Sequence, residues 1–370
     1  MSLSIPLFKV HTPRAAHAAL KPVLESGRLA CGPQVAEFER RFAQWIGAPA
    51  ALALSDASAA LSLALYAAGV RPGDEVLTPA LACSATVMPV AALFARPVWY
   101  DVDPATGMPN EQHLAAALTP KTCAVLLYHW SGDVAAVAAA SDFCRRHHLK
   151  LVEDASEALG ARLRGNYLGG VADFTVFSFY PTKPLNTGEG AALLAADPTA
   201  LQQARRLRRF GFEPAGLRLP NGDLNPQLDI PVAGFNVPMN ELAATLGLAA
   251  LGDIDGIAAL HRANGLYYET ALAGTAGVRL LKRDAQAESA YWTYSLLAER
   301  RDDLVAKLTS HGIGAQRLHL RNDGFSCFGG VHAALPGTAE FDACNLSIPC
   351  GWWVDEGARE RIVQCIRDGW

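Results

Sequence analysis

The chain has 370 residues, of which 51% are hydrophobic and 18% are charged. This composition provides enough apolar side chains for a large buried core, and it excludes a disordered or fibrous protein. The 32 lysines and arginines and the 36 aspartates and glutamates give a formal net charge of −4. Because no block of basic residues interrupts this balance, we expect no nucleic-acid partner.

The eight cysteines are scattered along the chain and form no CxxC pair. We interpret them as reduced thiols of a cytoplasmic protein, and we expect no metal site. The start of the chain does not resemble a secretory signal, and no apolar run reaches the length of a membrane span without a charge or a proline. We therefore expect no membrane partner.

Short β-type runs alternate with helical stretches rich in alanine and leucine between residues 50 and 194. This alternation predicts a parallel sheet covered by helices, and hence a large α/β domain. The predicted strands span residues 51–54, 75–78, 96–101, 123–128, 149–153, 174–179 and 191–195. Predicted helices between them span residues 59–68, 84–94 and 135–147.

The pattern changes after Pro198. A basic helix is followed by a loop rich in proline, glycine and asparagine, then by a long helical region broken near Gly252, and finally by a smaller α+β region. These features are predicted, in that order, over residues 201–209, 212–225, 239–273 and 277–370. Within the last region we predict strands over 277–280, 292–297, 315–318 and 346–348, and helices over 301–311 and 356–368. We divide the chain into a large domain over residues 1–250, with an N-terminal segment over 1–48, and a smaller domain over 251–370.

One lysine follows a predicted strand in a polar, glycine-rich loop: Phe174-Thr-Val-Phe-Ser-Phe-Tyr-Pro-Thr-Lys183-Pro. A lysine held where the chain leaves a sheet can condense with an aldehyde cofactor once its amine has lost a proton. A single lysine is nevertheless more often a solvated surface charge. Other residues must therefore decide between these two interpretations.

A second window, Leu149-Lys-Leu-Val-Glu-Asp154-Ala-Ser-Glu157, runs from an apolar strand into acidic residues. An aspartate at the carboxyl end of such a strand lies where open α/β sheets bind ligands. Its charge can keep a pyridine nitrogen protonated, which makes the ring an electron sink. The alternative is an aspartate that caps the following helix.

A third window, Ser55-Asp56-Ala57-Ser58, joins a predicted strand to a predicted helix. Small residues allow the first backbone amides of a helix to approach a phosphate group, which the helix dipole also attracts. Ser58 as an ordinary helix N-cap explains the same residues equally well.

Together with Gly32-Pro-Gln-Val, Gly73-Asp-Glu-Val76 and Gly234-Phe-Asn236-Val-Pro-Met-Asn-Glu, these windows make the chain resemble the DegT/DnrJ/EryC1/StrS family of sugar aminotransferases. The likeness covers nearly the whole chain. It implies a pyridoxal-phosphate enzyme of fold type I, the architecture of aspartate aminotransferase. That fold is a large, mostly parallel sheet flanked by helices, with a smaller C-terminal α+β domain.

The resemblance implies a role for individual residues. Lys183 would carry pyridoxal 5′-phosphate as a Schiff base, with pyridoxamine 5′-phosphate as the intermediate form, and Asp154 would pair with the ring nitrogen. The other cofactor contacts that it implies are Ala57, Ser58, Cys83, Glu157, Ser178 and, from a neighbouring subunit, Asn236. The last of these implies a homodimer with shared active sites.

Four positions depart from the family pattern. Asp56-Ala57-Ser58 replaces a Ser/Asn-Gly-Thr loop, Cys83 replaces an aromatic residue that stacks on the ring, Glu157 replaces glutamine or histidine, and Pro238 replaces a basic residue. The altered Asp56-Ala57-Ser58 loop and Cys83 keep open a non-catalytic regulatory protein that binds the cofactor. A pyridoxal-phosphate dehydratase is a further alternative, although its relatives in the family carry histidine in place of the lysine.

The polar cluster His319, Arg321 and Asn322 follows the strand predicted over residues 315–318. The resemblance implies that this region closes over the active site, which makes these three side chains candidate contacts for a nucleotide-sugar phosphate or a donor carboxylate; a solvated hairpin is the alternative. His129 is left as either a substrate contact or a structural histidine. The resemblance implies L-glutamate as the donor and a nucleotide-linked 4-keto-6-deoxy sugar as the acceptor, with the 4-amino sugar as the product.

Overall fold

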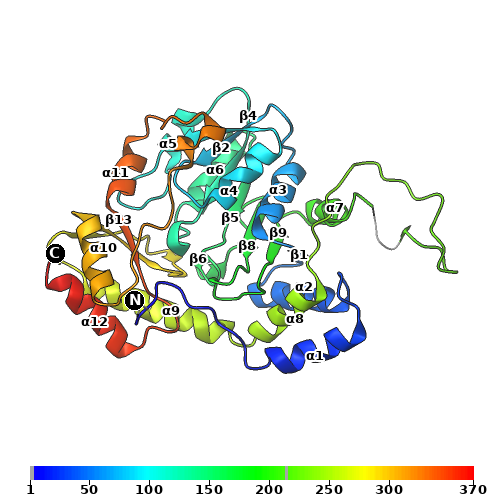
Figure 1. The fold of residues 1–370 in the computed structure, drawn as a ribbon. Helices are drawn as coiled ribbons and strands as arrows, with labels where there is room; N and C mark the ends of the chain where they lie inside the picture. The colour runs from blue at the N-terminus through cyan, green and yellow to red at the C-terminus, as the bar shows by residue number, and fades with distance from the viewer. Residues whose placement is uncertain (1–3, 213–215) are drawn as a thin grey trace.

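The computed structural model describes residues 4–212 and 216–370, and its centre is a seven-stranded sheet with the order β1-β9-β8-β5-β4-β2-β3 (Figure 1). Its strands are β1 (Leu52–Leu54), β2 (Glu75–Pro79), β3 (Arg96–Tyr100), β4 (Thr122–Tyr128), β5 (Lys150–Asp154), β8 (Phe174–Ser178) and β9 (Ala191–Ala195). Only β9 pairs antiparallel with its neighbours in this sheet. The prediction of a mostly parallel α/β sheet is confirmed, and each predicted strand agrees within one residue at either end.

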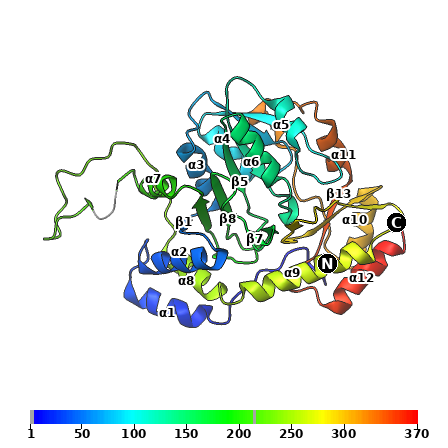
Figure 2. The same cartoon turned by 180° about the vertical axis from the view of Figure 1, so that it is seen from behind.

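Each face of the sheet is covered by its own layer of helices, because successive strand residues point to opposite faces. Leu126, Val176 and Leu193 face one layer, whereas Leu127, Phe177 and Leu194 face the other. The first layer, visible in Figure 1, consists mainly of α3 (Ala57–Ala67), α4 (Ser84–Ala92) and α7 (Pro198–Arg208). The second, which includes α6 in the view of Figure 2, contains α2 (Pro33–Ile46), α5 (Glu111–Ala117), α6 (Val137–Arg146) and α8 (Glu241–Ala250).

The C-terminal part of the chain builds a second, antiparallel sheet with its own core. Its strands are β10 (Val278–Leu280), β12 (Tyr294–Ala298) and β13 (Asn345–Ile348). Helices α9 (Ile254–Ala271), α10 (Arg301–Ser310) and α12 (Glu356–Arg367) pack on it, and Ile5 from the start of the chain joins the same core. The predicted helix break at Gly252 is confirmed, since α8 and α9 meet there at an angle of 61°. The domain boundary near residue 250 stays a prediction.

Two small features differ from the sequence-based expectation. Residues 315–318 form no strand: Gln316 makes one isolated antiparallel bridge with Ser347, so that prediction is wrong. A third sheet of β6 (Arg162–Leu163), β7 (Asn166–Tyr167) and β11 (Ala287–Glu288) was not predicted, because strands of two residues carry no readable alternation. The short helices α1 (Ala16–Ser26) and α11 (Pro336–Cys344) complete the fold.

The predicted loop over residues 212–225 includes residues 213–215, which lie outside the described residues. From residue 216 to about residue 235 the chain is irregular and projects away from the body as an arm in Figures 1 and 2. Leu219, Leu224 and Ile230 are exposed along this arm. Within the described ranges no single helix is long and apolar enough to span a membrane, while α8 and α9 pass that test only as a bent pair.

We expect Phe42→Ala to lower the free energy of unfolding by about 3–5 kcal/mol, because removing a buried phenyl ring leaves a cavity. The Phe42 ring is fully buried, and the rings of Phe38, Phe177 and Phe179 lie with their centroids 5.4–5.9 Å away. Urea unfolding provides the measurement. The matched control is Phe94→Ala at a side chain that is 79% exposed, where we expect a change within about 0.5 kcal/mol. Equal losses in the two variants would contradict the assignment of Phe42 to the core.

Candidate active site

The strands β1, β2, β4, β5 and β8 all end at one edge of the sheet, and a cavity of about 770 Å³ lies at that edge. The segments that follow these strands supply most of its walls, and the rest comes from Asn240 just before α8, Trp292 just before β12, and His319 between α10 and α11. Eight of the residues proposed from the sequence line this cavity: Ala57, Ser58, Cys83, Asp154, Glu157, Ser178, Lys183 and His319. The fold therefore brings together residues that are separated by up to 262 positions, from 57 to 319, along the chain.

Lys183 sits in a turn after β8, where its backbone N–H donates to the Tyr180 carbonyl at 2.9 Å. Its side chain is only 10% exposed, which excludes the solvated surface lysine. The amine nitrogen lies 3.9 Å from Glu157 Oε1 and 3.4 Å from the centre of the Trp292 ring. Burial lowers the pKa of Lys183 below its ordinary value, although the charges of Glu157 and Asp154 oppose this shift. A lysine with a lowered pKa provides the unprotonated, nucleophilic amine at lower pH.

Asp154 is buried at the end of β5, and both of its carboxylate oxygens are held by hydrogen bonds. Thr86 Oγ1 in the first turn of α4 donates to Oδ2 at 2.5 Å, and the Ser156 backbone N–H donates to Oδ1 at 3.0 Å. The next element after β5 is the short strand β6 and not a helix, so the alternative of a helix cap is wrong and the bond to Ser156 is a contact within a turn. Because the carboxylate also lines the cavity, it is positioned to pair with a protonated ring nitrogen.

Asp56, and not Ser58, is the N-cap of α3, since its Oδ1 accepts from the Ala59 N–H at 2.8 Å. Ala57 and Ser58 are then the first two residues of the helix, whose backbone N–H groups have no acceptor within the helix itself. The N-terminus of α3 faces the cavity together with the Ser178 side chain. Helix amides and hydroxyls in this arrangement suit a phosphate group, although the carboxylate of Asp56 adds a negative charge at the same end.

Glu157 is almost completely buried and is held from two sides. Its Oε2 accepts from the Ser131 N–H at 2.8 Å, and its Oε1 lies 3.2 Å from His319 Nε2. Burial raises the pKa of Glu157, but the charge of Lys183 and the hydrogen bond with His319 outweigh that effect and lower it overall. Cys83 precedes α4 in the cavity wall, and burial raises the pKa of its thiol, which keeps the sulfur protonated.

The other residues proposed from the sequence do not line this cavity. Asn322 is buried, and its side-chain amide donates to the Ala82 carbonyl at 2.8 Å, while Arg321 pairs with Asp323 at 2.5 Å. Asn236 lies at the base of the arm, where its backbone bridges to that of Arg209, and its role across a subunit boundary stays a prediction. His129 is fully buried beneath the site, with Nδ1 at 3.2 Å from the Asp133 carbonyl oxygen, which favours the structural alternative.

Sequence reasoning missed several residues of the cavity wall, above all Trp292. This indole covers the amine of Lys183 and donates from Nε1 to the Thr182 carbonyl at 2.9 Å. Trp292 stands 109 positions after Lys183, just before β12, so no local pattern connects the two residues. Thr86 and Tyr128 were also missed, although both follow or end strands at the edge where ligands were expected.

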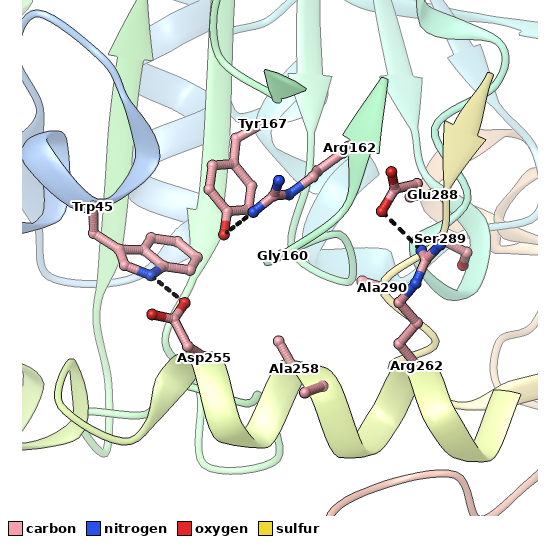
Figure 3. Close-up of a pocket in the computed structure, with 11 residues that line it drawn as sticks. Trp45, Gly160, Arg162, Tyr167, Asp255, Ala258, Arg262, Glu288, Ser289 and Ala290 are labelled. Atoms are coloured by element: carbon pink, nitrogen blue, oxygen red, sulfur yellow. Dashed lines mark hydrogen bonds and ion pairs between the residues drawn. The ribbon is translucent and has the colours of Figure 1, made fainter. Parts of the chain in front are cut away.

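A second cavity of about 400 Å³ lies between α9 and the small sheet of β6, β7 and β11 (Figure 3). Its polar side chains are paired with one another. Trp45 donates to Asp255 at 2.8 Å, Arg162 donates to the Tyr167 hydroxyl at 2.9 Å, and Arg262 pairs with Glu288 at 3.1 Å. Because these pairs satisfy the charged groups internally, we place the chemistry in the cavity that contains Lys183.

The Lys183 cavity combines three chemical groups. A buried amine can condense with an aldehyde, a fixed carboxylate can hold a protonated pyridine nitrogen, and a helix N-terminus with a nearby hydroxyl can bind a phosphate. These groups fit a phosphorylated pyridine aldehyde.

Comparison with known proteins agrees with this combination of groups. The model of the DegT/DnrJ/EryC1/StrS aminotransferase family matches residues 13–367. GDP-perosamine synthase from Caulobacter vibrioides is 34% identical over 290 residues, which cover 76% of this chain and 75% of that protein. The dTDP-3-amino-3,4,6-trideoxy-alpha-D-glucose transaminase from Streptomyces venezuelae is 30% identical over 359 residues, covering 95% of this chain and 91% of that protein. The crystal structure of the sugar aminotransferase CalS13 from Micromonospora echinospora superposes with a TM-score of 0.93 at 34% identity, covering 99% of this chain and 100% of that one.

We expect Asn322→Ala to lower the free energy of unfolding by about 1–3 kcal/mol, because the buried carbonyl of Ala82 would lose its side-chain donor. The measurement is urea unfolding of the variant against the wild type. Asn221→Ala, at an exposed residue of the arm, is the control, with an expected change within about 0.5 kcal/mol. Wild-type stability combined with weakened substrate binding in Asn322→Ala would instead support the substrate contact proposed from the sequence.

Proposed function

Since this chain belongs to the DegT/DnrJ/EryC1/StrS aminotransferase family, we propose that it transfers the amino group of L-glutamate to the keto carbon of a nucleotide-linked 4-keto-6-deoxy sugar. The protein is a sugar aminotransferase that depends on pyridoxal 5′-phosphate. The observation that carries the proposal is the buried amine of Lys183, which shares one cavity with Asp154 and the N-terminus of α3.

Different residues around the cavity would bind different parts of the cofactor. Lys183 Nζ would bind the aldehyde carbon, Asp154 would hold the proton on the ring nitrogen, and Ala57, Ser58 and Ser178 would bind the phosphate. When bound, the cofactor withdraws electrons from the carbon next to the amino nitrogen and makes that carbon acidic. The hydrogen bond from Thr86 keeps the Asp154 carboxylate oriented for this purpose.

Lys183 then serves as the general base. Once the amino donor has displaced it, the free amine of Lys183 would take the proton from the α-carbon of L-glutamate, and the bound cofactor would supply the acceptor for that proton. In the second half-reaction Lys183 would move a proton in the opposite direction, while the amino group held by the cofactor would pass to the keto carbon of the sugar and the keto oxygen would leave as water. The Trp292 ring covers the amine and limits the access of water to it.

The direct test is incubation with L-glutamate and a panel of nucleotide-linked keto sugars, with product analysis by mass spectrometry and NMR. We expect a sugar aminated at C4, together with 2-oxoglutarate. The stretches Arg209-Phe-Gly-Phe and Asn236-Val-Pro-Met-Asn-Glu resemble the branch of the family that makes 4-amino sugars more than the 3-amino branch, which supports the C4 position. Formation of only a 3-amino sugar from a 3-keto substrate would contradict it. Loss of a sugar hydroxyl without consumption of donor would indicate a dehydratase, and a colourless, inactive protein would indicate a regulator.

We expect Lys183→Met to lower the transamination rate by about 10²–10⁴-fold or more, because it removes both the covalent attachment and the general base. The rate of 2-oxoglutarate formation measures the effect. Lys21→Met, at a side chain that is 76% exposed, is the matched control and should retain the wild-type rate. Wild-type turnover in Lys183→Met would contradict the central role of this lysine.

We further infer a homodimer with shared active sites, in a cytoplasmic location where the eight free cysteines remain thiols. The arm over residues 216–235 supports a second copy as partner, because it projects from the body (Figure 1). Its side chains Leu219, Leu224 and Ile230 are also exposed in the single chain. Its base carries Asn236, the residue for which the resemblance implies a contact with the neighbouring cofactor phosphate.

Light scattering after gel filtration tests the dimer. We expect the mass of two chains for the wild type and of one chain for the double variant Leu224→Glu/Ile230→Glu, since buried carboxylates would oppose association through the arm. Both positions are exposed in the single chain, at 63% and 46%. Leu266→Glu, at an equally exposed leucine of α9 (47%), is the control and should remain dimeric. A one-chain mass for the wild type, or a two-chain mass for the double variant, would contradict the proposal.

A further inference from the structure

The strongest unassigned feature is a group of three side chains beside Lys183: Glu157, His319 and Tyr128. A single carboxylate oxygen, Glu157 Oε1, lies 3.9 Å from the amine of Lys183 and 3.2 Å from His319 Nε2. The other oxygen, Oε2, is occupied by the backbone N–H of Ser131 at 2.8 Å. The orientation of the carboxylate is therefore fixed, and Lys183 and His319 compete for the same oxygen.

His319 Nε2 is in turn shared between two partners. It lies 2.8 Å from the Tyr128 hydroxyl as well as 3.2 Å from Glu157 Oε1. The edge-on contact of the imidazole with the Trp130 ring, at 5.6 Å between centroids, helps to hold this orientation. The side chain of His319 is 12% exposed, so the protein and not bulk water provides most of its hydrogen-bonding partners.

One nitrogen carries either a proton or a lone pair, and the two states have different consequences. When Nε2 carries a proton, it donates to Glu157 Oε1 and takes up part of the carboxylate charge. When Nε2 is bare, it accepts from the Tyr128 hydroxyl, and Lys183 is left as the cation nearest to Oε1. Burial and the charge of Glu157 raise the pKa of Tyr128 well above its ordinary value, so the hydroxyl keeps its own proton.

The charged and titratable groups that face this cluster come from four segments. Asp154 ends β5 and Glu157 follows it, Tyr128 ends β4, Cys83 precedes α4, and Lys183 follows β8. Among these groups Glu157 is the anion placed between Lys183 and His319. A change in the hydrogen bonding of His319 therefore reaches Lys183 through Glu157.

We propose that His319 is a positioning residue which, through the shared oxygen of Glu157, sets the proton affinity of the Lys183 nitrogen. With Nε2–H donating to Glu157, the carboxylate attracts the proton on Lys183 less strongly, and the lysine is released more readily as a neutral base. No bond other than these hydrogen bonds changes. The inference rests on the proposed function, in which this nitrogen bears the cofactor.

A double-mutant cycle of His319 and Glu157, on the enzyme with its cofactor bound, tests the effect of His319 on Lys183 without any sugar substrate. The readout is the pH midpoint of the visible absorbance of the bound cofactor, which reports the proton on the Lys183 nitrogen. We expect His319→Phe, which keeps a ring against Trp130 but removes the donor, to raise this midpoint by about 0.5–1 pH unit, a 3–10-fold gain in proton affinity. In the Glu157→Gln background the same substitution should shift the midpoint by less than about 0.2 unit.

His319→Gln serves as the conservative variant, because its side-chain N–H can still donate to Glu157. We expect it to produce less than half of the shift seen with phenylalanine. His319→Leu, which also removes the donor, replaces His319→Phe in the cycle if that variant fails to fold. An unchanged midpoint, a downward shift, or equal shifts in the two backgrounds would overturn the inference. If the His319 substitution shifts the absorbance midpoint only when Glu157 is present, but the protein aminates no nucleotide sugar, the proposed substrate is refuted and the inference stands.

Discussion

The structure of the site depends on one constraint, the burial of the Lys183 amine. A buried ammonium loses the solvation that it would have in water, so the surroundings must either supply a counter-charge or favour the neutral amine. This protein does both. Glu157 and Asp154 provide negative charge within the cavity, yet burial still lowers the pKa of Lys183 below that of an ordinary lysine. A base that must accept a proton and release it again requires this intermediate situation.

The rest of the fold keeps these charges in place. Asp154 ends one parallel strand, and its carboxylate is fixed by the first turn of a helix that follows another strand. Glu157 is fixed by the backbone of Ser131, whose hydroxyl in turn donates to the Thr293 carbonyl at 2.6 Å, next to Trp292. The large sheet and the residues before β12 therefore meet at the lysine. Positioning of this kind, by groups that are themselves hydrogen-bonded, keeps acids and bases oriented without reorganisation during the reaction.

The seven strands of the large sheet could be predicted from the sequence because buried parallel strands are short apolar runs between helices. Asp154, Ser178 and Lys183 could be placed together for the same reason, since each follows or ends such a run. Trp292 and the contact of Glu157 with His319 could not be predicted, because they depend on how the C-terminal part packs against the sheet edge. Asn322 shows that a polar residue can also be given a role from the sequence that differs from its contacts. Its place in a polar cluster suggested a ligand contact, whereas its side-chain amide donates to the buried carbonyl of Ala82.

The departures from the family pattern are easier to understand once the contacts are known. A glutamate next to the ring hydroxyl would repel a phenolate oxygen if its charge were uncompensated. In the structure the Glu157 carboxylate is compensated by Lys183, His319 and the Ser131 N–H. Cys83 places no aromatic ring in the cavity wall, whereas Trp292, from a different segment, places its ring over the Lys183 amine. Glu157 and His319 therefore act together. The hydrogen bond with His319 stabilises the Glu157 carboxylate beside the expected position of the ring hydroxyl. Because the same carboxylate oxygen lies 3.9 Å from the Lys183 amine, this hydrogen bond also affects the lysine.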